Sequence, residues 1–540
     1  MPNTAASEEV KKSTLILIAL FLIIVTGIFL RTFHFSDFLQ FNPDQARDAK
    51  IVSDWISGQG TMPFFGPKAG GTEFHLGPIF YYFGAVSAKI FGPMPDKMAY
   101  PDLLFSILSI PLFYFFLKKY FNYLISLALT FIFSISFFVV FYSRFSWNPN
   151  QIPFFTLLFL FSILQPGEEK NEFKNFWALL FGISLAILIQ LHTLLLVALP
   201  VFSAIVLMHL IKRKKVEFKE IIIIVLTVIF LNFGQIYSEI KTGGANVAEF
   251  RKSSNARSDG SRRIFSNIET IATCQIQSNL HIIYPTSSGK KCNLFDFSGE
   301  IGKSRSYFRW AEKNAYSLGF SMLSIIFSTI GYYLIYYFYR KEEDNNRKNF
   351  LKLVALYNLT IFLIFIPVAS EMYLRYFIML FFVPFILLGL WLKKITESKQ
   401  KFLVPVLAVA VFLALVSNGR VLAEEYQIYA SGNETDVNNV IMKDILPMAD
   451  YIASAAGSAK AIHLAGNDLY LIRFKKSLAW FLEKKGIEIW SAEKNEALPI
   501  FYIGKTDEDK NLSEATISGR AVDDFRKFNK ITIYKLKAAN

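Results

Sequence analysis

The chain has 540 residues, with 57 Lys and Arg against 43 Asp and Glu, which gives a formal net charge of +14 at pH 7. Hydrophobic residues make up 53% of it, charged residues only 19%, and Phe alone occupies 56 positions. Because soluble domains carry roughly 25% charged residues, this composition excludes a soluble globular enzyme, and it also excludes a disordered chain. Long apolar runs indicate that most of the chain lies in a bilayer.

The first apolar run covers residues 14–30, between Lys11-Lys12 and Arg31. A spanning helix needs about 20 apolar residues. Residues 31–34 offer no small-residue cleavage site of the kind that ends a signal peptide. We therefore expect a permanent first transmembrane helix.

Further apolar runs bring the expected total to about eleven transmembrane helices. They cover 99–117, 122–141, 151–164, 174–191, 194–211, 219–236, 316–339, 350–369, 372–392 and 402–418. Because short cytoplasmic loops collect Lys and Arg, a cytoplasmic N-terminus places every basic cluster between these runs in the cytoplasm. The parity requires that 79–91 does not cross, and a run of this length is short enough to be an interfacial or re-entrant helix.

This threading leaves four segments outside a cytoplasmic (inner) membrane. They are a first loop (31–98), a short second loop (142–150), a long loop (237–315) and the tail after residue 418. The tail has the composition of a soluble domain, with helical spacing at 440–455 and 469–485 and strand-like patterns at 461–464, 500–503 and 531–536. We expect a membrane domain over 1–418 and a small extracytoplasmic α/β domain over 419–540.

The long external loop contains both cysteines of the chain, Cys274 and Cys292. Two thiols in one external loop favour a disulfide, and the alternative is two unrelated free thiols. The same loop carries five basic residues against Asp259 between Arg251 and Arg263. This basic segment is either solvated or in contact with lipid phosphates or an anionic acceptor.

The first external loop contains an expected helix that begins after Asn42-Pro43, a pair that favours a helix start. A turn of about 100° per residue places Asp44 and Asp48 on the apolar stripe of this helix. Burial beside apolar groups disfavours the charged form of an acid and makes it a better base. The alternative for Asp44 is that an anion merely favours a helix N-terminus.

Other polar and aromatic residues fall on the same outer side and are candidates for binding a donor phosphate or substrate. They are Glu73, His75, Tyr81, Tyr82, Arg144, Asn148, His192 and Arg375. Some have structural alternatives: Arg144 with Trp147 is typical of an interfacial anchor, and Arg375 could pair with Glu371. Charges at a membrane edge are costly and usually functional, so their convergence favours a site.

The order of these features resembles the GT-C superfamily of lipid-linked-sugar glycosyltransferases, in particular its protein O-mannosyltransferase and lipid A aminoarabinose transferase branch. The resemblance covers about residues 14–395. It rests on Arg31 at the end of the first helix and on the motifs at 41–44, 75–82 and 374–376. It implies a polyprenyl-phosphate sugar as donor, Asp44 as the first-loop carboxylate at the reaction centre, and Arg375 near the donor phosphate.

Members of this superfamily often carry a second acid in the second external loop. Here that loop offers Asn148 and no carboxylate, so we expect no required cofactor, and a divalent metal is not supported. The expected partners are the lipid-linked donor, membrane lipid and an unidentified acceptor, with no nucleic acid.

The sequence therefore predicts an integral-membrane glycosyltransferase that moves a hexosyl or pentosyl group to a protein, lipid or cell-envelope glycan on the extracytoplasmic face. Asp44 would take the acceptor proton, and Arg375 with Arg144 would stabilise the phosphate charge. One alternative is a transporter or flippase of lipid-linked glycans, for which repeated halves and mid-membrane charges would be typical. Another is a membrane-anchored scaffold.

Overall fold

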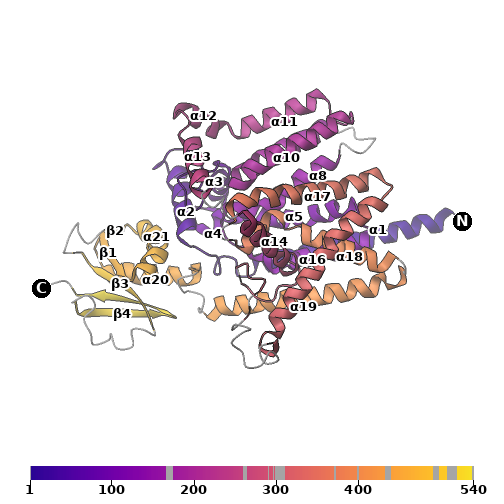
Figure 1. Ribbon diagram of the computed structural model, residues 1–540. Helices are drawn as coiled ribbons and strands as arrows, with labels where there is room; N and C mark the ends of the chain where they lie inside the picture. Colours follow the sequence, from indigo (N-terminus) through magenta and orange to yellow (C-terminus); the bar gives the residue numbers. More distant parts are fainter. Residues whose placement is uncertain are drawn as a thin grey trace.

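The computed structural model is a helical bundle with a small sheet at one end (Figure 1). The two termini lie at opposite ends of the molecule. The structure describes residues 2–165, 174–258, 264–289, 291–295, 297, 311–369, 372–397, 400–431, 439–490, 498–506 and 520–537. Asp259, Arg262, Arg263 and Glu371 lie outside the described residues.

Every run predicted to span the membrane is helical, which confirms a multi-pass membrane protein. Within the described ranges, seven spans are long and apolar enough to cross a bilayer, or up to nine if each of two bent pairs counts once. The helices of the seven spans are α1 (Pro2–Thr32), α5 (Tyr100–Lys118), α9 (Lys174–Leu191), α10 (Thr193–Lys212), α16 (Ala315–Lys341), α17 (Asn345–Phe365) and α19 (Leu403–Ser431).

The remaining predicted runs are bent or interrupted, so the number of about eleven stays a prediction. Helix α11 (Phe218–Leu231) meets α12 (Phe233–Lys241) at 62°, and the 3₁₀ helix η6 (Leu374–Leu380) meets α18 (Val383–Glu397) at 66°. Helix α8 (Ile152–Leu164) has 13 residues.

The run at 122–141 breaks at Ser136 into α6 (Tyr123–Ile135) and α7 (Phe137–Phe141). At the break, Asn418 Oδ1 accepts a hydrogen bond of 2.7 Å from the Phe137 backbone N–H. A helix can break inside a bundle only where such a partner satisfies the freed backbone group, and an apolar run in the sequence does not reveal that partner.

Basic residues from three helices, α1, α17 and α18, gather at one end of the bundle, around Tyr120. Arg347 donates a hydrogen bond of 2.8 Å to the Tyr120 carbonyl oxygen, and Lys393 donates one of 2.9 Å to its hydroxyl. Lys12 of α1 lies 4.6 Å from the centre of the nearby Tyr123 ring. The opposite end carries the first loop and the C-terminal sheet (Figure 1).

The first loop contains three helices, α2 (Pro43–Ile56), α3 (Ile79–Phe91) and the short α4 (Pro95–Met98). Helix α3 has 13 residues, too few to cross a bilayer of about 30 Å at 1.5 Å per residue. It packs against α2 and α5 at the end of the bundle. The short helix that the threading requires for this run is therefore present, and its failure to cross the membrane stays a prediction.

The C-terminal part folds as two helices on a mixed five-stranded sheet, in agreement with the predicted α/β class. Its elements are α20 (Met442–Ala456), β1 (Ala461–Gly466), α21 (Asp468–Lys484), β2 (Glu488–Trp490), β3 (Ile500–Lys505), β4 (Val522–Phe528) and β5 (Ile531–Leu536). The strand order is β2-β1-β3-β5-β4, with parallel β2-β1-β3 and antiparallel β3-β5-β4. Helix α19 continues to Ser431 across the compositional boundary at 419.

Cys274 and Cys292 form the predicted disulfide, with their Cα atoms 5.1 Å apart. Cys274 belongs to α14 (Ile264–His281), which follows α13 (Ala245–Ser258). The residue before Cys292, Lys291, forms an isolated antiparallel bridge with Tyr373. The disulfide joins α14 to Cys292, and the adjacent bridge between Lys291 and Tyr373 joins this part of the loop to the segment that carries Arg375.

Candidate active site

Two of the three carboxylates of α2, Asp44 and Asp48, are linked by Arg47. Its Nη1 lies 2.9 Å from Asp44 Oδ1, and its Nη2 lies 2.8 Å from Asp48 Oδ1. Tyr81 of α3 donates its hydroxyl proton to the same Asp48 oxygen over 2.9 Å. The structure thus brings the predicted candidates Asp44, Asp48 and Tyr81 together, and it adds Arg47 to them.

The two acids differ in exposure, and here the wheel is wrong for Asp44. The Asp44 side chain is 68% exposed, whereas that of Asp48 is only 8% exposed. Tyr81 of α3 contacts Asp48 directly, whereas Asp44 pairs with Arg47 at the surface. Burial raises the pKa of Asp48 above its usual value, against the opposing effects of Arg47 and Tyr81.

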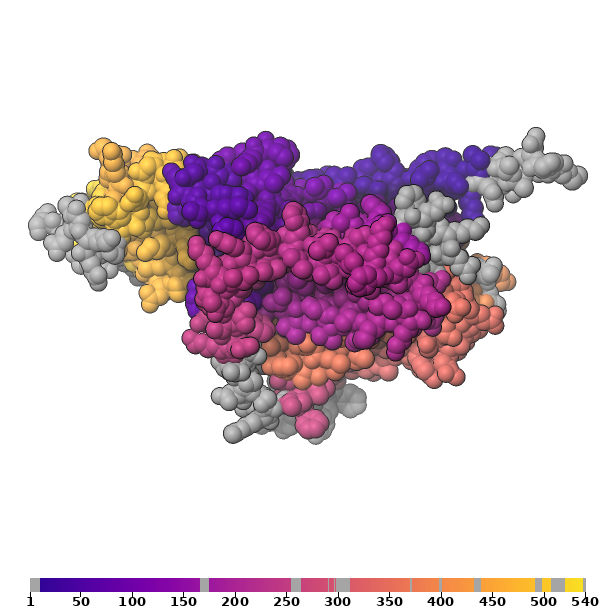
Figure 2. Space-filling view, turned by 90° about the horizontal axis from the view of Figure 1, so that it is seen from above, coloured from indigo at the N-terminus to yellow at the C-terminus, as the bar shows by residue number. Residues whose placement is uncertain are grey.

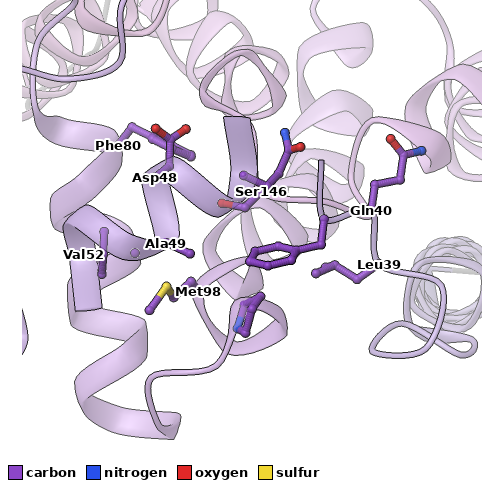
Figure 3. A pocket seen from close by; sticks show the side chains of 12 residues that line it. Leu39, Gln40, Asp48, Ala49, Val52, Phe80, Met98 and Ser146 are labelled. Carbon is purple, nitrogen blue, oxygen red and sulfur yellow. The ribbon is translucent and has the colours of Figure 1, made fainter. Parts of the chain in front are cut away.

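A small pocket, open to solvent, lies beside Asp48 (Figure 3). Asp48, Ala49 and Val52 line it from α2, with Gln40 and Ser146 contributing from the segment before α2 and from the second loop. Gln45 also lines it, and its side-chain oxygen is buried with no hydrogen-bond partner in the described part of the chain. The pocket is therefore largely apolar, with a carboxylate and a few amide and hydroxyl groups for orienting a ligand.

The residues just before α3 form a separate group with structural contacts. Glu73 pairs with Lys68 at the surface. His75 is held by Asn246 Oδ1, which accepts from its backbone N–H over 2.7 Å, and by a 3.0 Å contact between its Nδ1 and the Gly66 carbonyl. Among the described residues, no hydrogen bond or ion pair joins Glu73 or His75 to Asp44 or Asp48.

The start of α3 is fixed by Gln190. Its side-chain oxygen accepts a hydrogen bond of 3.1 Å from the Ile79 backbone N–H. A Cβ atom on Gly77 would collide with the Gln190 side chain, so this approach requires glycine. Tyr82 donates a hydrogen bond of 2.8 Å to the Pro63 carbonyl and packs near Trp55. These contacts hold α3, and with it Tyr81, in register with α2.

Arg144 does not lie free for a phosphate. Its Nη1 donates to the carbonyl oxygens of Leu30 and Arg31 over 3.0 and 2.9 Å, and its Nη2 donates to Phe33 over 2.6 Å. These are carbonyl groups at the end of α1, which lack intrahelical partners. Arg144 therefore caps α1, and the geometry does not support the predicted phosphate contact.

Arg375 is exposed and surrounded by aromatic rings. Its guanidinium carbon lies 4.9 Å from the ring centre of Tyr373, 5.4 Å from that of Tyr376 and 6.0 Å from that of Trp147. Within the part of the chain that the structure describes, no carboxylate pairs with it. Arg375 therefore keeps its five donors available for an anion.

His192 and Asn148 lie near Arg375 and bond to backbone groups at the junction of α9 and α10. His192 caps α10 by accepting from the Leu194 backbone N–H over 3.2 Å. Burial, and then the charge of Arg375, lower the pKa of His192 to about 4, so its ring is neutral at pH 7. Asn148 donates a hydrogen bond of 2.6 Å to the Leu191 carbonyl. Because Ser146 lines the Asp48 pocket and Trp147 packs near Arg375, the second loop connects the two parts of the site.

No group of three or more His, Cys, Asp or Glu side chains that could hold a metal ion occurs among the described residues. The acids of α2 are also engaged by Arg47, a cation that competes for the same oxygen atoms. The expectation that no metal is required stays a prediction.

Comparisons with known proteins support the resemblance inferred from the motifs. Residues 75–234 match the family model described as dolichyl-phosphate-mannose-protein mannosyltransferase. The fold is similar to that of ArnT from Cupriavidus metallidurans bound to undecaprenyl phosphate, with 10% identity, a TM-score of 0.55, and coverage of 97% of this chain and 98% of that one. The apo state of that protein gives 9% identity, a TM-score of 0.57 and the same coverage. A search of curated protein sequences finds no match.

Proposed function

We propose that this multi-pass membrane protein, which has the ArnT-like fold of GT-C glycosyltransferases, transfers a sugar from a polyprenyl-phosphate donor to an acceptor. The observation that carries the proposal is that two carboxylates and an arginine without a carboxylate partner among the described residues lie at the same end of the bundle. Asp44 and Asp48 flank Arg47 beside a pocket, and Arg375 stands exposed across the second loop. A fold alone does not establish a reaction, so these residues define the test.

Asp44 is the proposed general base. It is exposed, and an acceptor hydroxyl or amine arriving from the aqueous side can reach it. The acceptor oxygen or nitrogen attacks the anomeric carbon, Asp44 removes its proton, and the bond to the donor phosphate breaks so that polyprenyl phosphate leaves. Asp48 is better placed as a positioning residue, because its buried Oδ1 holds both Arg47 and Tyr81.

Arg375 is the proposed partner of the leaving phosphate. Guanidinium groups match phosphate oxygens with two parallel hydrogen bonds, and charge grows on the phosphate as the sugar departs. The neutral His192 beside it adds no competing charge. ArnT in the similar structure is bound to undecaprenyl phosphate, and we propose the same class of lipid phosphate for this chain.

The proposed location is the extracytoplasmic face of the inner membrane, with a cytoplasmic N-terminus. The basic end around Tyr120 would face the cytoplasm under the positive-inside rule. The first loop and the C-terminal domain lie at the other end of the bundle (Figure 1). No metal is proposed, and the acceptor could be a protein, a lipid or an envelope glycan.

The transporter alternative is less well supported. The two bent helix pairs resemble the broken helices of transporters. However, the candidate charges lie at the end of the bundle rather than midway along it, and the match to ArnT extends over 97% of the chain.

The proposal is tested with purified protein in nanodiscs and a panel of undecaprenyl-phosphate-linked hexoses and pentoses, incubated with an extract of extracytoplasmic acceptors. Mass spectrometry follows release of undecaprenyl phosphate and the mass gain of the acceptor. The function predicts both together for one donor. Vectorial movement of an intact glycolipid across proteoliposomes without sugar release would instead support a transporter.

A further inference from the structure

The segment that leads into α2 pairs with the segment that leads into α20 of the C-terminal domain. The Phe41 backbone N–H donates to the Val440 carbonyl over 2.7 Å, and the Met442 N–H donates to the Leu39 carbonyl over 2.9 Å. Gln40 and Ile441 face each other as an antiparallel bridge. Two chain regions about 400 residues apart thus form a short ladder immediately before the carboxylate-bearing helix.

Asn42 directs its side chain to this ladder instead of to its own helix. It occupies the N-cap position of α2, where an Asn side chain usually accepts from the first turn, but it makes no such bond. Its Oδ1 accepts from the Val440 backbone N–H over 3.0 Å. The predicted capping role is therefore wrong, and the start of α2 depends on the C-terminal segment.

Helix α21 contacts the same region from the side. The Phe41 ring lies 5.7 Å from the ring of Trp480 and 5.5 Å from that of Phe481. Ser477 donates its hydroxyl proton to the Phe41 carbonyl oxygen over 2.5 Å. Further along α2, Lys50 lies 2.6 Å from Glu483.

These contacts are those of a packed interface. Phe41 is 1% exposed and Ser477 is 0% exposed. The C-terminal residues abut the first-loop residues in the space-filling view (Figure 2). A module tethered only by its linker would leave these side chains in water and would move freely relative to α2.

We propose that the C-terminal domain positions the active-site helix: α21 and residues 439–442 hold α2 on one side while α3 holds it on the other. This inference rests on the proposed function. Helix α2 carries both carboxylates, and a displacement of about 1 Å at a reacting group can cost a hundredfold in rate. Ser477 and Trp480 are positioning residues, because they act on Asp44 and Asp48 through Phe41.

Hydrogen exchange followed by mass spectrometry tests the clamp without any substrate. Ser477→Ala removes one hydroxyl and leaves the buried Phe41 carbonyl without its donor, so exchange of amides in residues 43–56 should rise about tenfold. Exchange in α5 and α9 should not change. Lys476→Ala, at an exposed neighbouring position of α21, is the matched control and should leave α2 unaffected. Unchanged exchange of α2 in Ser477→Ala, or an equal rise in every helix, would overturn the inference.

A measurement on the unsubstituted protein guards against a variant that fails to fold. Amides of α2 and α21 should lose protection at the same urea concentration and with the same urea dependence, because they open as one unit. Helices that lose protection at separate urea concentrations would contradict the clamp.

Kinetics then connect the clamp to the reaction. With the donor identified for the parent protein, Ser477→Ala should lower kcat about tenfold or more while the donor KM changes less than about twofold. Lys476→Ala should change neither. A parent without sugar transfer but with the α2 exchange effect would reject the proposed function and keep the clamp. A parent that transfers sugar, with Ser477→Ala equal in kcat and in exchange, would reject the clamp alone.

Discussion

The hydroxyl of Tyr81 donates to the buried carboxylate of Asp48 across the contact between α3 and α2, over 2.9 Å. The same Asp48 oxygen forms an ion pair with Arg47, which also pairs with Asp44. Helix α3 thereby fixes the orientation of the exposed Asp44 through Asp48 and Arg47. This relationship makes Asp48 the positioning group and leaves Asp44 as the reacting group.

Removing the positioning group should slow the reaction without abolishing it. We expect Asp48→Asn to lower kcat about tenfold to a hundredfold, because Arg47 loses its buried partner and Asp44 its fixed geometry. Tyr81→Phe should give a smaller loss in the same direction. Steady-state kinetics of sugar transfer check both, and an undiminished kcat in Asp48→Asn would contradict the assignment.

The pH dependence should report the buried acid. Because burial raises the pKa of Asp48, the acid limb of kcat should lie above pH 4, the usual range of an Asp side chain. The free energy of unfolding should change with pH in the opposite direction to kcat. A raised pKa in the folded protein means that stability contributed by protonation is present at low pH and is lost as pH rises through the folded pKa. The change in Tm caused by Asp48→Asn should therefore be more favourable at pH 7.5 than at pH 4.5. Equal Tm changes at both pH values would argue against a shifted Asp48.

Arg375 and Arg144 should behave differently although both lie at the outer end of the bundle. Arg375→Ala should weaken binding of undecaprenyl phosphate in nanodiscs about tenfold or more, because one charge-assisted contact is worth roughly 1.5–3 kcal/mol. Its Tm should stay unchanged, since the side chain is exposed and contacts only ring faces. Arg144→Ala should instead lower Tm, since it removes the donor to the carbonyl groups of Arg31 and Phe33, while Leu30 keeps its hydrogen bond from the Tyr426 hydroxyl. The reverse pattern would exchange their roles.

The disulfide should stabilise the segment that carries Arg375. Closing a loop with a sequence separation of 18 residues is worth about 3 kcal/mol of stability. Replacing Cys274 and Cys292 together by Ser should lower Tm and loosen the bridge between Lys291 and Tyr373, which is two residues from Arg375. Thiol labelling of the folded, unreduced parent should detect no free cysteine. Labelling of Cys274 or Cys292 in the parent would contradict the proposed role of the disulfide.

Much of the architecture could be predicted from the sequence because a bilayer imposes simple length and charge rules. The first helix, the short 79–91 helix and the cysteine pair each depend on local pattern, and each is present. Strands β2 and β4 were missed. Both are edge strands; β2 has only three residues, and β4 is mostly exposed and charged. Neither shows the apolar alternation that identifies a buried strand.

The site was harder to predict because its details depend on contacts between distant segments. A helical wheel assumes one buried face, but α2 is covered by α3 on one side and by residues 439–442 and α21 on the other. This is why Asp44 is exposed and Asn42 is engaged elsewhere. Arg144 was assigned to a phosphate because its three carbonyl partners at the end of α1 are more than 100 residues away in the chain.

The most direct measurement is release of polyprenyl phosphate from the lipid-linked sugar donor by the parent protein and by Asp44→Asn, prepared identically and matched in Tm. The account predicts turnover by the parent and a loss of about a thousandfold or more in Asp44→Asn, with undecaprenyl phosphate still bound at parental affinity. Parental turnover in Asp44→Asn would contradict a first-loop carboxylate as the reacting base.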